Sequence, residues 1–195
     1  MPLGAFKAAL MGTAGVSTGD VVLLSSQTAD GDASISFTSG ITSTYGEYIF
    51  RFYDINPSSD GATFQWQVNV AGQSGYNETV TSTSFTTYHR EDDGGSALGY
   101  QTGQDQGQGT AYEELAPGVG NGADESLVGE IHLFNPSNKT YVKHFIARIR
   151  HYQLLNYNVD EFRSGYFNVT GAIDDVQFKV STGNFDGKIK MWGVK

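Results

Sequence analysis

The chain has 195 residues, enough for one ordinary domain, and its formal net charge of -9 at pH 7 argues against binding to nucleic acid or to an anionic membrane surface. It contains no cysteine, which excludes disulfides and thiolate chemistry. Twenty-five glycines, four prolines and 13% aromatic residues, in a chain with few helix-forming stretches, predict an all-β domain.

The first twenty residues show no strand pattern. They hold small residues and a weak apolar stretch that Lys7 interrupts, without a basic segment before it, which argues against a signal peptide. No apolar run approaches the length of a transmembrane helix. We interpret residues 1–20 as an N-terminal extended arm and residues 21–195 as the folded domain.

Strand signals follow one another from Val21. Residues 21–24 form an apolar run, and after a turn at 29–32 apolar residues alternate with serines to residue 37. Residues 47–55 are apolar on both faces, as in a central strand. Residues 64–70 alternate, which predicts Phe64, Trp66, Val68 and Val70 inside and Gln65, Gln67 and Asn69 outside. A Thr- and Ser-rich strand is expected at 80–89.

Residues 91–125 break this pattern. The segment is rich in Gly and Gln and has no long period, and we interpret it as a long insertion with a short strand around 111–115. Irregular segments of this length inside a domain are often functional. The segment is therefore a candidate contact surface or subunit interface.

Strand signals resume at 127–134 and continue to the C-terminus. Residues 140–152 predict a long strand with Phe145, Ala147 and Ile149 on one face and His144, Arg148 and Arg150 on the other. A strand follows at 165–169, and residues 173–195 predict a terminal hairpin around the turn at 181–187. Eight to ten strands at this spacing predict a jelly-roll-like β-sandwich.

The motifs of catalysis are incomplete. G-G-S-A-L-G at 94–99 resembles an esterase elbow but lacks the second glycine of G-x-S-x-G and the strand–turn–helix setting. Glu113–Glu114 and Asp92–Asp93 are adjacent carboxylates, which point to opposite faces of a strand and cannot flank one glycosidic bond. We interpret both pairs as solvated acidic loops. No enzyme and no cofactor is predicted.

Metal and nucleotide motifs are also weak. The four histidines are scattered, and the Gly clusters lack the strand-to-helix context and the lysine of a phosphate loop. D-G-D at 30–32 and N-G-A-D-E at 121–125 could hold a structural calcium ion, but turn formation explains them equally well. No metal site is predicted.

Tyrosines in or beside loops are the remaining signal, because tyrosine stacks on sugar rings and is frequent at protein interfaces. Ordinary loop packing is the alternative. The tyrosines in question are Tyr76, Tyr88, Tyr100, Tyr112 and Tyr157. We select Tyr88, Tyr100 and Tyr112 as the candidate contact or ligand surface.

Three segments together resemble a known family. They are S-S-Q-T-A-D-G-D-A-S-I-S-F-T-S-G-I-T-S-T-Y at 25–45, G-E-I-H-L-F-N-P-S-N-K-T-Y-V-K-H-F at 129–145 and S-T-G-N-F-D-G-K-I-K-M-W-G-V-K at 181–195. They resemble a family of tailed-bacteriophage proteins, common in marine phages and described as minor structural or hypothetical virion proteins. The resemblance spans nearly the whole chain and implies a location in the virion, after assembly in the host cytoplasm, but no catalytic residue.

The resemblance gives the arm and the domain an expected role. An arm of small residues suits attachment to a larger assembly, with Phe6, Leu10 and Met11 as its candidate anchors. We expect a non-enzymatic virion protein that decorates the capsid or forms a tail- or fibre-associated host-contact part. Its expected partners are other virion proteins, further copies of itself with a trimer favoured, and a host surface glycan, without membrane insertion. The alternatives are a stand-alone carbohydrate-binding module and a polysaccharide hydrolase.

Overall fold

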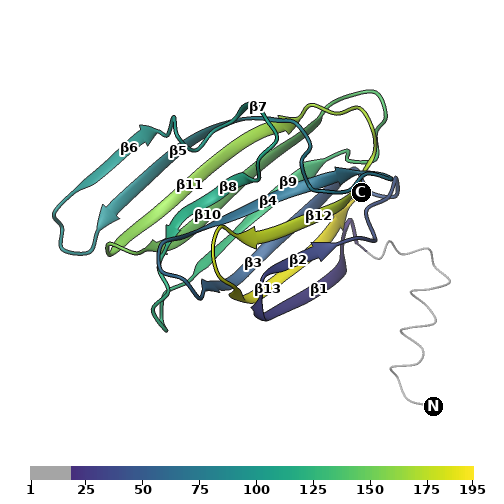
Figure 1. The fold of residues 1–195 in the computed structure, drawn as a ribbon. Coiled ribbons are helices and arrows are strands. Elements are labelled where there is room, and N and C mark those ends of the chain that lie inside the picture. The colour runs from purple at the N-terminus through teal and green to yellow at the C-terminus, as the bar shows by residue number, and fades with distance from the viewer. Residues whose placement is uncertain (1–18) are drawn as a thin grey trace, which may run out of the picture.

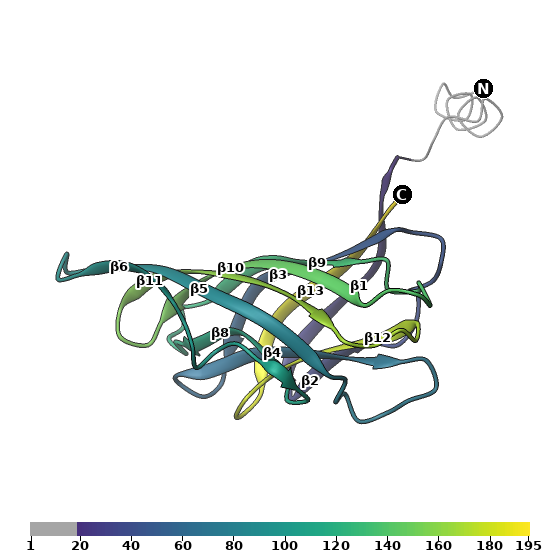
Figure 2. The same cartoon turned by 90° about the horizontal axis from the view of Figure 1, so that it is seen from above.

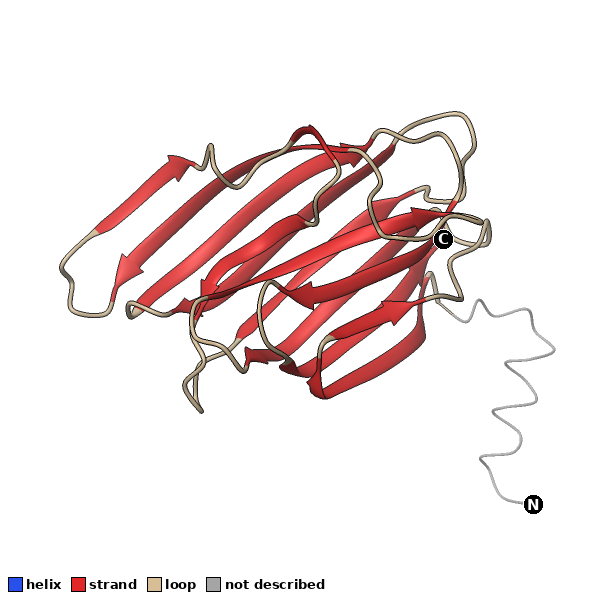
Figure 3. Ribbon diagram, viewed as in Figure 1, coloured by secondary structure: helices blue, strands red, loops and turns tan. Residues whose placement is uncertain are grey.

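The computed structural model describes residues 19–195, and every regular element in that range is a β-strand (Figure 3). All strand pairs are antiparallel, and the strands form two packed layers (Figures 1 and 2). The predicted all-β sandwich is thus confirmed. The same residues contain no helix long and apolar enough to cross a bilayer.

The large sheet forms one layer. Its strand order is β1 (Val21–Asp32), β13 (Phe185–Val194), β3 (Glu47–Pro57), β9 (Leu127–Phe134), β10 (Lys143–Gln153), β11 (Tyr157–Phe167) and β5 (Val80–Arg90). The far edge of β5 pairs with both β6 (Ser96–Tyr100) and β7 (Gly107–Gly109). β3 is interior to the sheet, between β13 and β9, as predicted for a central strand, but only one of its faces lies against the core: Phe50 and Phe52 are buried there, whereas Arg51 and Tyr53 are exposed on the other face.

The small sheet forms the other layer. Its order is β8 (Glu113–Val119), β4 (Ala62–Val70), β12 (Ile173–Val180) and β2 (Ser34–Phe37). The two layers meet at one corner, where Gln153 of β10 pairs with Val119 of β8. At the other corner the chain passes almost directly from β1 to β2. The described residues hold thirteen strands, more than the eight to ten predicted, because the segment 91–125 contains β6, β7 and β8.

The core lies between the layers and is aromatic. Phe178 of β12 is fully buried, with its ring centroid 5.1 Å from that of Phe52 and 5.3 Å from that of Phe50, across the sandwich. The shared face predicted for Phe145, Ala147 and Ile149 of β10 is confirmed, and it lies against the core, because all three are buried. Val176 and Val180 of β12 are buried beside Phe178.

The prediction of a terminal hairpin was wrong. β12 pairs with β4 and β2 in the small sheet, whereas β13 pairs with β1 and β3 in the large sheet. The connecting loop bonds to the start of β4 and to the β3–β4 loop: Ser181 N–H donates to Thr63 O at 2.9 Å, and Ser58 N–H donates to Asn184 O at 2.8 Å. The two strands therefore reach the core from opposite layers.

The prediction that Gln67 and Asn69 face outward was also wrong. Both side chains are buried because neighbouring loops cover the outer side of β4. Gln67 Nε2 donates to Glu78 O and Ala111 O, and Asn69 Oδ1 accepts from Tyr76 N–H at 2.8 Å. Polar alternation on a strand is compatible with burial when loop backbone satisfies the side chains.

Candidate functional site

A cleft lies where the large sheet extends beyond the small one. The end formed by β5, β6 and β11 projects past β8 (Figures 1 and 2), so that the inner side of these strands is not covered by the small sheet there. The hollow measures about 270 Å³ and is lined mainly by polar and aromatic side chains, among them Tyr88, Gln101, Gln104, His151, Gln153, Tyr157 and Glu161. We call this hollow the polar cleft.

An ion pair is buried at the base of the polar cleft. Arg163 Nη2 lies 3.3 Å from Glu161 Oε2, and both side chains are almost wholly inaccessible. The guanidinium also donates to Gln104 O at 2.9 Å, to Gln104 Oε1 at 2.7 Å and to Ser84 Oγ. Thr86 Oγ1 donates to the same Glu161 oxygen. Because a buried charge is tolerated when it is paired and hydrogen-bonded, these contacts explain how the sheet accommodates Arg163.

Glu113 is a second buried carboxyl beside this pair. Its residue is fully buried, Gln106 Nε2 donates to its Oε2 at 3.1 Å, and its Oε1 has no partner among the described residues. Burial raises the pKa of Glu113 to about 7 and also raises the pKa of Glu161, whereas burial lowers the pKa of Arg163. The interpretation of Glu113 as part of a solvated acidic loop was therefore wrong.

His151 has one defined tautomer. Its Nε2 lies 3.0 Å from Pro117 O, a carbonyl that can only accept, and burial lowers the pKa of the imidazole to about 4. At neutral pH the ring is therefore uncharged, with the proton on Nε2. Nδ1 is then an acceptor, and it has no partner in the described part of the chain.

The described residues of the polar cleft do not present the pair of carboxyl groups used by most glycosidases. Of the described residues that line it, Glu161 alone carries a carboxylate. Acid–base cleavage of a glycosidic bond requires two carboxyl groups, one on each side of the bond. The cleft instead presents amides, phenols and one anchored carboxylate, which is a set suited to hydrogen bonding with a neutral ligand.

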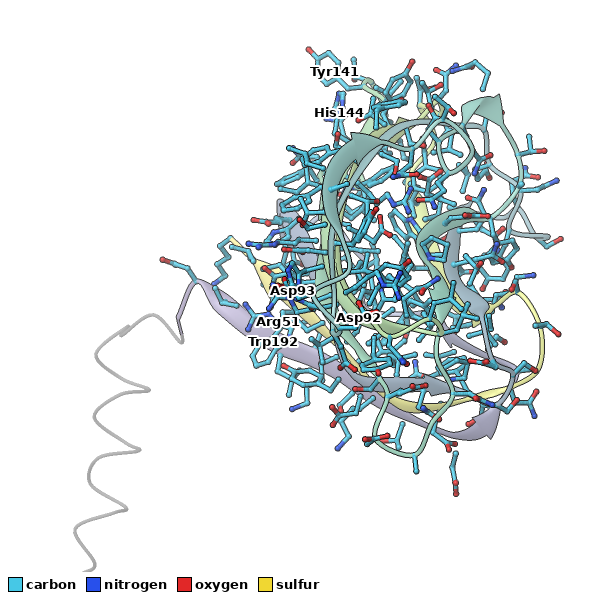
Figure 4. All side chains as sticks on the ribbon, turned by 90° about the vertical axis from the view of Figure 1, so that its left-hand side faces the viewer. Arg51, Asp92, Asp93, Tyr141, His144 and Trp192 are labelled. Carbon is cyan, nitrogen blue, oxygen red and sulfur yellow. The ribbon has the colours of Figure 1, made fainter. Side chains whose placement is uncertain are left out.

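The solvent-facing side of the large sheet is the second candidate site, and we call it the outer face. One row of paired residues crosses seven strands, in the order Tyr100, Phe85, Phe162, Arg148, Glu130, Arg51 and Lys190. Arg51 Nε bonds Glu130 Oε2 at 3.0 Å, and Arg148 bonds Asp160 Oδ2 at 2.7 Å. Figure 4 shows Tyr141, His144, Arg51 and Trp192 along this side of the molecule.

The outer face combines exposed apolar residues with cations. Large apolar side chains on six strands remain exposed on it: Val21, Leu23, Tyr53, Phe85, Leu98, Tyr100, Val128 and Ile146. Five of the chain's 12 Lys and Arg residues also lie there: Arg51, Arg148, Arg150, Lys188 and Lys190. Isolated exposed apolar residues are ordinary, but a set spread across one sheet face is typical of an interface.

The structure does not bring the three selected tyrosines together. Tyr88 lies on the inner side of β5, lining the polar cleft, with its ring 5.1 Å from that of Tyr157. Tyr100 pairs with Phe85 on the outer face. Tyr112 packs on the outer side of the small sheet, where its hydroxyl donates to Gln177 and Lys179 Nζ lies 4.0 Å from its ring. The candidate anchors Phe6, Leu10 and Met11 lie outside the described residues.

The residues of the buried cluster were missed, although the pattern contained a signal for two of them. Glu161 and Arg163 have the same parity along β11 as the buried Val159 and Phe167. Strand alternation therefore places both charges on the inward face. Glu113 and His151 gave no comparable signal, because their burial depends on which strands cover them.

The remaining motifs have structural roles. Ser96 of the elbow-like segment lies exposed on β6. The carboxylate of Asp92 accepts a hydrogen bond from Gly94 N–H at 2.8 Å in the β5–β6 turn, and this bond lowers the pKa of Asp92. Figure 4 labels Asp92 and its neighbour Asp93. Carboxylates of the two calcium-like loops bond to nearby backbone, as in Gly122 N–H to Glu125 Oε2 at 2.7 Å. Residues 19–195 contain no group of three or more potential metal ligands.

Comparisons with known proteins give no family assignment. No protein-family model matches the chain, and a search of curated proteins finds no significant match.

Proposed function

We propose that this chain is a non-enzymatic structural protein of a tailed-bacteriophage virion, and that copies of it associate through the outer face into a closed trimer. The resemblance of residues 25–45, 129–145 and 181–195 to phage virion proteins supports the location. The observation that carries the association is the outer face, which exposes large apolar residues on six strands and is covered by no element of the described chain.

The outer face suits a head-to-tail contact. Its two ends are apolar but different: Val21 and Leu23 of β1 are exposed at one end, and Leu98 and Tyr100 of β6 at the other. A ring of identical subunits requires two different complementary patches on each copy. Between these ends, cations and carboxylates alternate, as in the Arg51–Glu130 and Arg148–Asp160 pairs, so that one copy can also complement another in charge.

Native mass spectrometry of the full chain tests the association. We expect a discrete trimer that Leu23→Lys and Leu98→Lys each disrupt, because each places a charge in one half of the contact. Leu155→Lys is the matched control, since Leu155 is similarly exposed, at 59% against 69% for Leu98, but lies at the β10–β11 turn. A monomer at micromolar concentration would refute the trimer. A shortened chain starting at Asp20 tests whether the arm contributes, and loss of the trimer there would assign it a role.

Mass spectrometry of purified particles of the phage that encodes the chain tests the location. The protein should be present at a fixed copy number relative to the major capsid protein. Its absence from particles would refute the virion role whatever the oligomeric state.

Carbohydrate binding is the second candidate function. The polar cleft favours it, because tyrosine and amide side chains line the same small hollow. The tyrosines selected from the sequence lie on three different surfaces, so a single aromatic platform does not form. Of the three, Tyr88 alone lines the polar cleft, which makes this cleft the candidate sugar site.

A further inference from the structure

We infer that the polar cleft is a binding site for one ring of a neutral sugar, held between Tyr88, the free amide of Gln101 and the anchored carboxylate of Glu161. This inference rests on the second candidate function and supplies its residues and ligand class. It is independent of the trimer, which uses the opposite side of β5 and β6.

The cleft presents hydrogen-bond donors and acceptors that have no partner in the described part of the chain. Among the described residues, the side-chain amide of Gln101 and the hydroxyls of Tyr88 and Tyr157 make no hydrogen bond, and all three residues line the hollow. Gln104 uses its Oε1 on Arg163, which leaves its NH₂ group free. A sugar hydroxyl both donates and accepts, so it matches amides and phenols better than an ion does.

One acceptor at the base of the cleft is fixed in place and open to a ligand. Glu161 accepts from Thr86 and Arg163 through Oε2 alone, which leaves Oε1 without a protein bond while the residue lines the hollow. His151 also lines the hollow, but its unpartnered Nδ1 is itself buried and is not open to a ligand. A ligand hydroxyl or a bridging water can donate to Glu161 Oε1.

Charge and size restrict the ligand. Two cations lie close to the cleft, and both are already bonded. Arg163 donates through Nη1 and Nη2 to Ser84, Gln104 and Glu161, and Arg90, whose guanidinium lies 5.5 Å from the ring of Tyr157, bonds Asp92 Oδ2 at 2.7 Å. These bonds disfavour a phosphate, sulfate or carboxylate as the ligand. The Arg163 charge also compensates that of Glu161, which weakens selection for a cationic ligand. A hollow of about 270 Å³ is smaller than an ordinary drug-sized pocket and suits a single ring.

Saturation-transfer NMR on the full chain tests the inference. The probes are the methyl glycosides of glucose, galactose, mannose and N-acetylglucosamine, with choline as a cationic probe and glucose 6-phosphate as an anionic one. We expect at least one neutral glycoside to bind with a millimolar dissociation constant and the two charged probes not to bind. Failure of every neutral glycoside, or tighter binding of choline, would overturn the inference.

Variants locate the site. Tyr88→Ala and Gln101→Ala should each weaken binding by about 10-fold, because they remove a ring contact and a hydrogen-bonding pair. Tyr100→Ala, a tyrosine on the opposite side of the same strand pair, should bind as the wild type, and so should Leu98→Lys. Retained binding in both cleft variants with loss in Tyr100→Ala would move the site to the outer face and refute this one. Gln101 is a half-exposed loop residue, so its variant tests the site without disturbing the core.

Discussion

Replacing Glu113 by glutamine should change how the stability of the domain depends on pH. The pKa of Glu113 is about 7 in the folded protein, against 4.5 for an unperturbed glutamate, because burial disfavours the charged carboxylate. Because the pKa of Glu113 is higher in the folded than in the unfolded chain, its protonated form contributes fully to the free energy of unfolding below pH 4.5. This contribution is lost as the pH rises to 7. At about 1.4 kcal/mol per pKa unit, the loss amounts to about 3 kcal/mol.

His151 acts in the opposite direction over almost the same range. Its pKa is about 4 in the folded protein, against 6.5 for an unperturbed histidine, so its contribution is complete above pH 6.5 and is lost as the pH falls to 4. Between pH 4.5 and 6.5 the two contributions have opposite slopes of similar size. We therefore expect them to cancel in the wild type, which conceals both.

Single substitutions should separate the two contributions. Glu113→Gln cannot titrate, so its free energy of unfolding relative to wild type should rise by about 3 kcal/mol from pH 4.5 to pH 8. His151→Gln, relative to wild type, should gain about 3 kcal/mol as the pH falls from 7 to 4. The double variant is the control for coupling, since the two groups belong to one buried region.

Urea unfolding followed by tryptophan fluorescence measures these differences at each pH. Trp66 is fully buried in the core, so its emission reports the loss of the sandwich. A difference between Glu113→Gln and wild type that stays within about 0.5 kcal/mol from pH 4.5 to pH 8 would show that Glu113 has no raised pKa and that the linkage reasoning is wrong.

Two further substitutions test the packing, each with a matched control. Gly165→Ala should lower the free energy of unfolding in urea by about 2–4 kcal/mol, because the added Cβ would lie 2.9 Å from Ser82 Cα and closer still to Thr81 O. In the control Gly99→Ala the Cβ meets nothing within 4 Å, so this variant should be neutral or slightly stabilising. Equal effects of the two variants would contradict the strand pairing. Phe178→Ala should lower the free energy of unfolding by about 3–5 kcal/mol, because five aromatic rings surround Phe178. The control is Phe85→Ala on the outer face, where Phe85 is 43% exposed, and it should cost less than about 1 kcal/mol in the monomer. Similar losses in the two variants would place the core elsewhere.

The local pattern predicted which face of a strand is buried wherever apolar and polar residues alternate. Phe145, Ala147 and Ile149 of β10 are buried, and the intervening side chains are exposed. The prediction succeeds because strand geometry alternates side chains with a period of two, whatever the strand pairs with. The all-β class follows from the same local regularity.

Partner choice was beyond the reach of local pattern. The sequence pattern predicted that β12 and β13 pair with each other as a hairpin. In the structure β12 pairs with β4 in the small sheet and β13 pairs with β3 in the large sheet, and the loop between them is hydrogen-bonded to Thr63 and Ser58. Gln67 read as exposed, yet two distant carbonyls cover it. Such outcomes depend on residues far away in the sequence.

The sequence by itself therefore determined that the domain is all-β, that it carries a net negative charge, and which side chains share the buried face of the most regular strands. Only the tertiary structure decided that Glu113, Glu161, Arg163 and His151 meet in one buried region, and that Tyr88, Tyr100 and Tyr112 lie on separate surfaces. The physical reason is that alternation is a property of a single strand. Burial of a charge and the composition of a cleft depend on which strands and loops pack against it.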